Sequence, residues 1–96
     1  MTKALSTVEI ENALKSNPAW KLQGGKLIRE WTFKDFVEAM QFVNRVAVVA
    51  EAAGHHPDID VRYNRVLLGL VSHDAGGITA RDESMASTID KEFAVE

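Results

Sequence analysis

Side chains that could transfer protons gather in one short part of the chain. The sequence holds three histidines, an adjacent pair at His55 and His56 followed by Pro57, and a single His73. Imidazole exchanges protons near neutral pH and also binds metal ions. Histidines that meet in space could therefore serve acid–base catalysis or form a three-histidine metal site.

The histidine pair follows a predicted long helix over residues 34–53. Gly54 is suited to end this helix in the left-handed conformation, and Pro57 forces the residue before it into an extended one. Glu51 lies four residues before His55, so its carboxylate is expected to reach that ring. The recurrence of apolar residues at intervals of three and four predicts a buried stripe made of Phe36, Met40, Val43, Ala47 and Ala50.

A predicted hairpin brings His73 back toward the pair. One strand is expected through Ile59, Val61 and Tyr63, a turn near Asn64, and a second strand over residues 66–73. If the chain turns at Asn64, His73 returns close to residues 55–57. We therefore expect the three imidazoles to converge on one pocket at the rim of the sheet.

The remaining segments complete a small α+β fold. Ser6 and Glu9 predict the start of a first helix, and Thr79 with Asp82 the start of a last one. Two strands, over residues 20–23 and 26–33, should be joined by a tight turn at Gly24 and Gly25. The expected fold is a four-stranded antiparallel sheet with three helices packed on one face, a two-layer sandwich that forms one domain over residues 1–96.

Composition narrows the classes of function. A formal net charge of -3 offers no basic surface for nucleic acid, and no apolar run is long enough to span a bilayer. The chain has no cysteine, which excludes disulfides and thiol catalysis. No signal-peptide pattern opens the sequence, so a cytoplasmic location is expected, with no nucleic-acid or membrane partner. Val48 and Val49 extend the apolar stripe of the long helix, which predicts a homo-oligomer.

The stretch EAAGHHPDIDVRYNRVLLGLVSHDAGGITARD resembles the signature of the pterin-4a-carbinolamine dehydratases. The resemblance is carried by seven positions at fixed spacing, namely Glu51, His55, His56, Pro57, Tyr63, His73 and Asp82. The family also has this order of helices and strands and about this length. Ile59 stands where members often carry an aromatic residue, and Ser72 stands where threonine is common.

The resemblance implies a reaction and a set of site residues. The reaction is the loss of water from 4a-hydroxytetrahydropterin to give quinonoid dihydropterin, without a metal or organic cofactor, in tetrahydrobiopterin recycling. The implied catalytic residues are His55, His56 and His73. The implied supporting or substrate-binding residues are Glu51, Pro57, Asp58, Ser72, Asp74 and Asp82.

The resemblance also implies a homodimer or homotetramer. Two other functions stay open at this point. One is a protein-interaction module that acts as the dimerisation cofactor of a transcription factor, as some relatives do. The other is a hydrolase that uses the three histidines to hold a metal ion.

Overall fold

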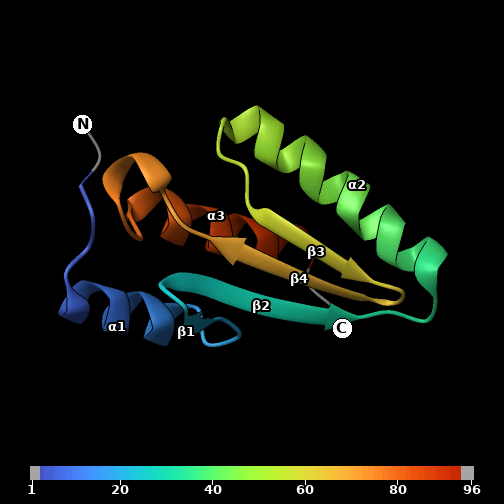
Figure 1. Ribbon diagram of the computed structural model, residues 1–96, viewed down its shortest axis with the longest axis horizontal. Helices are drawn as coiled ribbons and strands as arrows, with labels where there is room; N and C mark the ends of the chain where they lie inside the picture. The colour runs from blue at the N-terminus through green and yellow to red at the C-terminus, as the bar shows by residue number, and fades with distance from the viewer. Residues whose placement is uncertain (1–2, 94–96) are drawn as a thin grey trace.

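The computed structural model describes residues 3–93, and its elements follow the predicted order (Figure 1). They are α1 (Thr7–Ser16), β1 (Lys21–Gln23), β2 (Lys26–Thr32), α2 (Phe36–Ala53), β3 (Asp58–Arg62), β4 (Arg65–Leu70), the short 3-10 helix η1 (His73–Ala75) and α3 (Ala80–Glu92). Residues 1, 2 and 94–96, which the expected domain includes, lie outside the described part. None of the described helices has the length and apolarity needed to cross a membrane.

The four strands form one antiparallel sheet in the order β1-β2-β4-β3. The turn between β1 and β2 uses Gly24 and Gly25 at φ values of 60° and 77°, a geometry that side chains disfavour. The hairpin of β3 and β4 turns at Tyr63 and Asn64 and pairs Asp58 with Gly69. The start of β3, just after the histidine pair, therefore lies beside the end of β4, just before His73.

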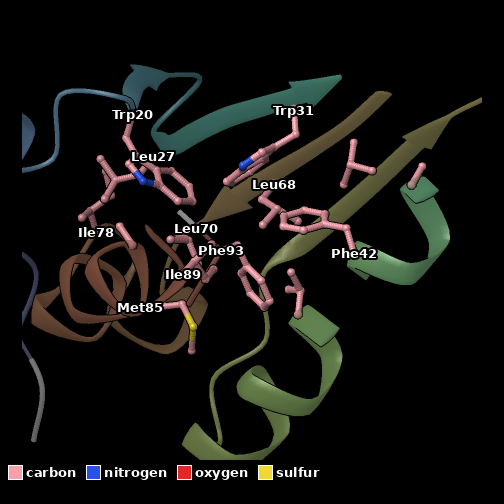
Figure 2. Close-up of a cluster of buried hydrophobic side chains, with 14 residues drawn as sticks. Trp20, Leu27, Trp31, Phe42, Leu68, Leu70, Ile78, Met85, Ile89 and Phe93 are labelled. Atoms are coloured by element: carbon pink, nitrogen blue, oxygen red, sulfur yellow. The ribbon is translucent and has the colours of Figure 1, made fainter. Parts of the chain in front are cut away.

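The helices cover one face of this sheet, as predicted. Alternate residues of β2 and β4 point into the core, where Trp31 and Leu68 meet Phe42 of α2 and Ile89 of α3 (Figure 2). The aromatic rings are close together, with ring centroids 4.8 Å apart for Trp31 and Phe42. Ile10 and Leu14 of α1 pack against the same cluster. Burial of this apolar surface is the main stabilising contribution to the fold.

Polar groups meet on the opposite face of the sheet. Lys26 Nζ of β2 lies 2.6 Å from Asp58 Oδ2 of β3, and the two side chains reach toward each other over Gly69 of β4. A Cβ atom at position 69 would lie 3.4 Å from Lys26 Cδ and 3.7 Å from Asp58 Cβ, so the two side chains lie directly against this glycine. Asp58 is thus exposed and paired at the very start of β3.

The buried stripe of α2 differs from the predicted one. The residues that α2 buries are Ala39, Phe42, Val46 and Ala50. Phe36 is 49% exposed and Ala47 is exposed, so the prediction was wrong for these two residues. The cause is that α2 is apolar on two adjacent sides. Spacing alone therefore allows two stripes, and packing against the sheet selects the one that carries Phe42.

Candidate active site

The end of α2 sets the direction of the histidine pair. Gly54 adopts the left-handed conformation with φ 65°, and the backbone N–H of His55 donates to the carbonyl of Ala50 at 3.2 Å. This arrangement closes the helix after Ala53 and turns the chain sharply away from the helix axis. Pro57 is buried and begins the extended path into β3. The two imidazoles consequently find different partners.

His55 pairs with a carboxylate from a distant part of the chain. Its Nε2 lies 2.6 Å from Oδ1 of Asp82, which stands in the first turn of α3. The side chain of His55 is 12% exposed and that of Asp82 is fully buried. A buried carboxylate requires partners, and the short contact to the ring provides one of them.

The second oxygen of Asp82 has two further donors. Its Oδ2 accepts hydrogen bonds from Ser72 Oγ at 2.8 Å and from the backbone N–H of Thr79 at 2.9 Å. The hydroxyls of Ser72 and Thr79 lie 2.8 Å apart, and both residues are buried. Asp82 therefore caps α3 and holds His55 at the same time. Asp82 thus has the helix-capping position expected from the sequence, and it also lies beside a histidine.

Glu51 pairs with His56, whereas the sequence predicted a contact with His55. Glu51 Oε1 lies 2.8 Å from Nε2 of His56, and their side chains are 82% and 63% exposed. The prediction assumed that the helical path continues through His55. Because the chain leaves the helix at Gly54, the ring of His55 turns toward Asp82 and the ring of His56 comes within reach of Glu51.

His73 lies just beyond β4 and not within it. The strand ends at Leu70, and His73 begins η1 with an exposed side chain. The loop that carries it is closed by hydrogen bonds in both directions between the backbones of Ser72 and Gly77. Asp74 accepts from Arg81 Nη2 at 2.7 Å, and this hydrogen bond lowers the pKa of the Asp74 carboxyl.

A groove of about 810 Å³ runs between α2 and α3. Its walls include Val48 and Val49 of α2 and Met85 of α3, with His55 and Arg81 among its polar residues. The three histidines lie at the same end of the β3–β4 hairpin, as expected. Of the three, only His55 lines this groove, whereas His56 and His73 are exposed. The prediction of a single pocket shared by all three histidines was therefore wrong.

The contact of His55 with Asp82 is an arrangement that can support proton transfer. Within residues 3–93, no three His, Asp or Glu side chains come together as the ligands of a metal ion would. His55 and buried Asp82 form a hydrogen-bonded pair beside a groove, a setting in which a side chain can act as a positioned acid or base.

Thr79, Arg81 and Ser84 are among the neighbours of the site that the sequence did not assign to it. The spacing of Thr79 and Asp82 did indicate a helix cap, and the observed α3 has that capping box. Their further contact with Ser72 arises from the tertiary fold, which spacing along the chain does not reveal.

Comparison with known proteins places the chain in a family. The family model described as "Pterin 4 alpha carbinolamine dehydratase" matches residues 3–92. The chain belongs to the pterin-4-alpha-carbinolamine dehydratase family. The match agrees with the resemblance seen in residues 51–82, and the match covers nearly the whole sequence.

Individual relatives in this family are similar over most of their length. A provisionally named pterin-4-alpha-carbinolamine dehydratase of Acidobacterium capsulatum is 59% identical over 86 residues, 90% of this chain and 94% of the relative. A protein with the same provisional name from Koribacter versatilis is 52% identical, over 95% of this chain and 97% of its own.

Solved structures have the same fold. A protein of Brucella melitensis described as a "transcriptional coactivator/pterin dehydratase" is 33% identical, with a TM-score of 0.85 over 93% of this chain and 97% of its own. A pterin dehydratase-like protein described as a RuBisCO assembly factor in the alpha-carboxysome is 21% identical, with a TM-score of 0.66 over 81% of this chain and 93% of its own. This second likeness concerns the fold alone.

Proposed function

We propose that this chain removes water from a 4a-hydroxytetrahydropterin and releases quinonoid dihydropterin. Membership of the pterin-4-alpha-carbinolamine dehydratase family supports the substrate class. The observation that carries the chemistry is the contact of 2.6 Å between His55 Nε2 and buried Asp82, because it holds one imidazole in a fixed orientation at a groove.

The reaction needs one proton delivered and another removed. An acid protonates the hydroxyl oxygen on C4a, the bond from C4a to oxygen breaks, and water leaves. A base takes the proton from N5, whose electron pair then forms the double bond to C4a. We assign this proton-transfer pair to His55, which lines the groove, and to His73, which is exposed outside it at the same end of the β3–β4 hairpin. We assign to His56, exposed at that end as well, the orientation of the pterin by hydrogen bonding. A pair of imidazoles in opposite protonation states suits the two steps near neutral pH.

The groove offers two different environments along its length. Because α2 and α3 run antiparallel, His55, Arg81 and Ser84 form one end, whereas Val48 and Thr88 lie toward the other. The polar end is where we place the pterin. We assign the apolar end to a second copy of the chain, in a homodimer or homotetramer, since Val48 is 70% exposed.

Purified protein provides the direct test. The full chain should accelerate the decay of 4a-hydroxytetrahydropterin to quinonoid dihydropterin, followed by absorbance, at catalytic concentrations of protein. A His55→Ala variant with the same circular dichroism spectrum is the matched control and should be much slower. A correctly folded wild-type protein that leaves the uncatalysed rate unchanged would disprove the proposal.

A second candidate is an interaction module for transcription. It is favoured by one observation, the description of the Brucella melitensis neighbour as a transcriptional coactivator as well as a pterin dehydratase. Binding to a transcription factor without any dehydratase activity would select this alternative. A role in tetrahydrobiopterin recycling and a cytoplasmic location stay predictions.

A further inference from the structure

We infer that His55 reacts through its Nδ1 atom, and that Asp82, Ser72 and Thr79 together fix the ring in the form that makes this possible. The inference rests on the proposed dehydratase function, because it names the atom of His55 that exchanges the proton. It concerns the position of a hydrogen on the ring, which follows from the directions of the surrounding hydrogen bonds.

First, both oxygens of the Asp82 carboxylate need hydrogen-bond donors. A carboxylate accepts hydrogen bonds and donates none. Its Oδ2 is occupied by the backbone N–H of Thr79 and by the hydroxyl of Ser72, and its Oδ1 faces Nε2 of His55. Nε2 must therefore carry a hydrogen whether the ring is neutral or charged. When the ring is neutral, Nδ1 is then the nitrogen without one.

The second step is the direction of the hydroxyl chain. Ser72 has one hydroxyl hydrogen, and it is given to Asp82. In the contact of 2.8 Å between the two hydroxyls, Thr79 must consequently be the donor. Thr79 Oγ1 in turn accepts from the backbone N–H of Arg81 at 3.2 Å. Each of these hydrogen bonds can therefore run in only one direction. The carboxylate of Asp82 cannot reorient without leaving a buried donor unpaired.

The third step concerns the free nitrogen. Within residues 3–93, Nδ1 of His55 forms no hydrogen bond with the protein, and the side chain lines the groove. Neutral His55 thus offers a base at Nδ1, and protonated His55 offers an acid at the same atom. Asp82 is a positioning residue, as are Ser72 and Thr79, since none of the three exchanges the proton itself.

Replacing Asp82 by asparagine tests which nitrogen of His55 carries the hydrogen. In Asp82→Asn, the two donors from Ser72 and Thr79 require the carbonyl oxygen at the Oδ2 position. The amide NH₂ must then face Nε2 of His55, which becomes an acceptor, and the neutral ring carries its hydrogen on Nδ1 instead. The variant preserves the size of the side chain, so the fold should persist.

The experiment combines nitrogen–proton NMR correlations of the histidine rings with steady-state kinetics. Neutral His55 should carry its hydrogen on Nε2 in the wild type and on Nδ1 in Asp82→Asn, and kcat should fall by about 100- to 10,000-fold with KM much less changed. Ser72→Ala is the matched control. It removes a hydrogen bond from the same carboxylate but leaves an acceptor for Nε2, so His55 should keep the wild-type form.

The outcomes separate this inference from the function on which it rests. The inference would be overturned if neutral His55 carried its hydrogen on Nδ1 in the wild type, or kept it on Nε2 in Asp82→Asn. It would also be overturned if the hydrogen moved to Nδ1 in Asp82→Asn while kcat stayed the same. If the rings behave as expected but the wild-type protein does not dehydrate the pterin, the proposed function fails and the assignment of the ring hydrogen stands.

Discussion

Arg45 lies over the ring of Phe93, with its guanidinium carbon 4.7 Å from the ring centroid. This contact joins the middle of α2 to the residue that ends α3, while His55 and Asp82 join the opposite ends of the same two helices. These two contacts join α2 to α3 toward the two ends of the groove that runs between them. Its walls should keep their separation when the protein is free of ligand.

The position of the buried stripe on α2 can be tested with two phenylalanines of the same helix. Phe42 is 6% exposed and Phe36 is 49% exposed. Phe42→Ala should lower the free energy of unfolding by about 3–5 kcal/mol, the usual cost of removing a buried ring. Phe36→Ala should lower it by less than about 1 kcal/mol. Urea unfolding monitored by tryptophan fluorescence measures both, and equal losses would contradict the observed stripe.

The division of work among the histidines predicts different kinetic changes. His55→Ala and His73→Ala should lower kcat by about 100- to 10,000-fold, because each removes a positioned acid or base. His56→Ala should mainly raise KM. The double variant of His55 and His73 should lose far more than either single one. The roles would be wrong if His56→Ala abolished turnover while His55→Ala stayed near the wild type.

The pairing of Glu51 with His56 predicts which ring responds to a change at position 51. Glu51→Gln should shift the ring nitrogen signals of His56 and leave those of His55 unchanged, since Glu51 contacts only the former. Stability should stay within about 0.5 kcal/mol because the pair is exposed. Signals of His55 that move as much as those of His56 would indicate the pairing expected from the sequence.

The ion pair of Asp74 and Arg81 predicts a pH-dependent contribution at the loop that carries His73. Because the hydrogen bond from Arg81 lowers the pKa of Asp74, the pair stabilises the folded state above the ordinary pKa of an aspartate. This contribution should disappear as the pH falls through the lowered value.

Thermal unfolding of the wild type and Asp74→Asn measures this contribution. The wild type should be slightly more stable at pH 7, and the two proteins should become equal in strong acid. The same substitution at exposed Asp60, which pairs with Arg62 on β3, is the control for a general effect of charge. A difference between wild type and Asp74→Asn that grows in acid would contradict the prediction.

Self-association is predicted to use the apolar end of the groove. Light scattering at micromolar concentration should give the mass of a dimer or tetramer for the wild type. Val48→Asp should lower that mass, because it places a charge on the proposed contact. Val8→Asp is the control, since Val8 of α1 is exposed to a similar degree, 63% compared with 70%. A monomeric wild type, or an equal response to both variants, would exclude this interface.

The fold was largely predictable because its turns depend on local chemistry. Gly24, Gly25 and Gly54 all have positive φ, and the capping pairs at Ser6 and Thr79 begin helices where expected. The stripe of α2 was less certain from sequence because alanine and valine occupy two adjacent sides of that helix. Only contact with the sheet decides between them.

Two neighbouring residues of the candidate site, His55 and Asp82, were named from the sequence, but their contact with each other was not predicted. The signature indicated the histidines and Asp82, and the structure brings Asp82 to His55 from a distance of 27 residues along the chain. Glu51 was assigned to the wrong ring because spacing arguments on a helix fail once the helix ends. The hydroxyl contact of Ser72 with Thr79 depends on how η1 folds back on α3, which no local pattern records.

One carboxylate, that of Asp82, both starts a helix and orients His55, and this has a consequence for cooperativity. The first turn of α3 and the fixed ring of His55 should form and break as one unit, so fraying of the helix would release the ring. The amide hydrogen of Thr79, which donates to Asp82, should therefore exchange with solvent at a rate that reports how often the site itself comes apart.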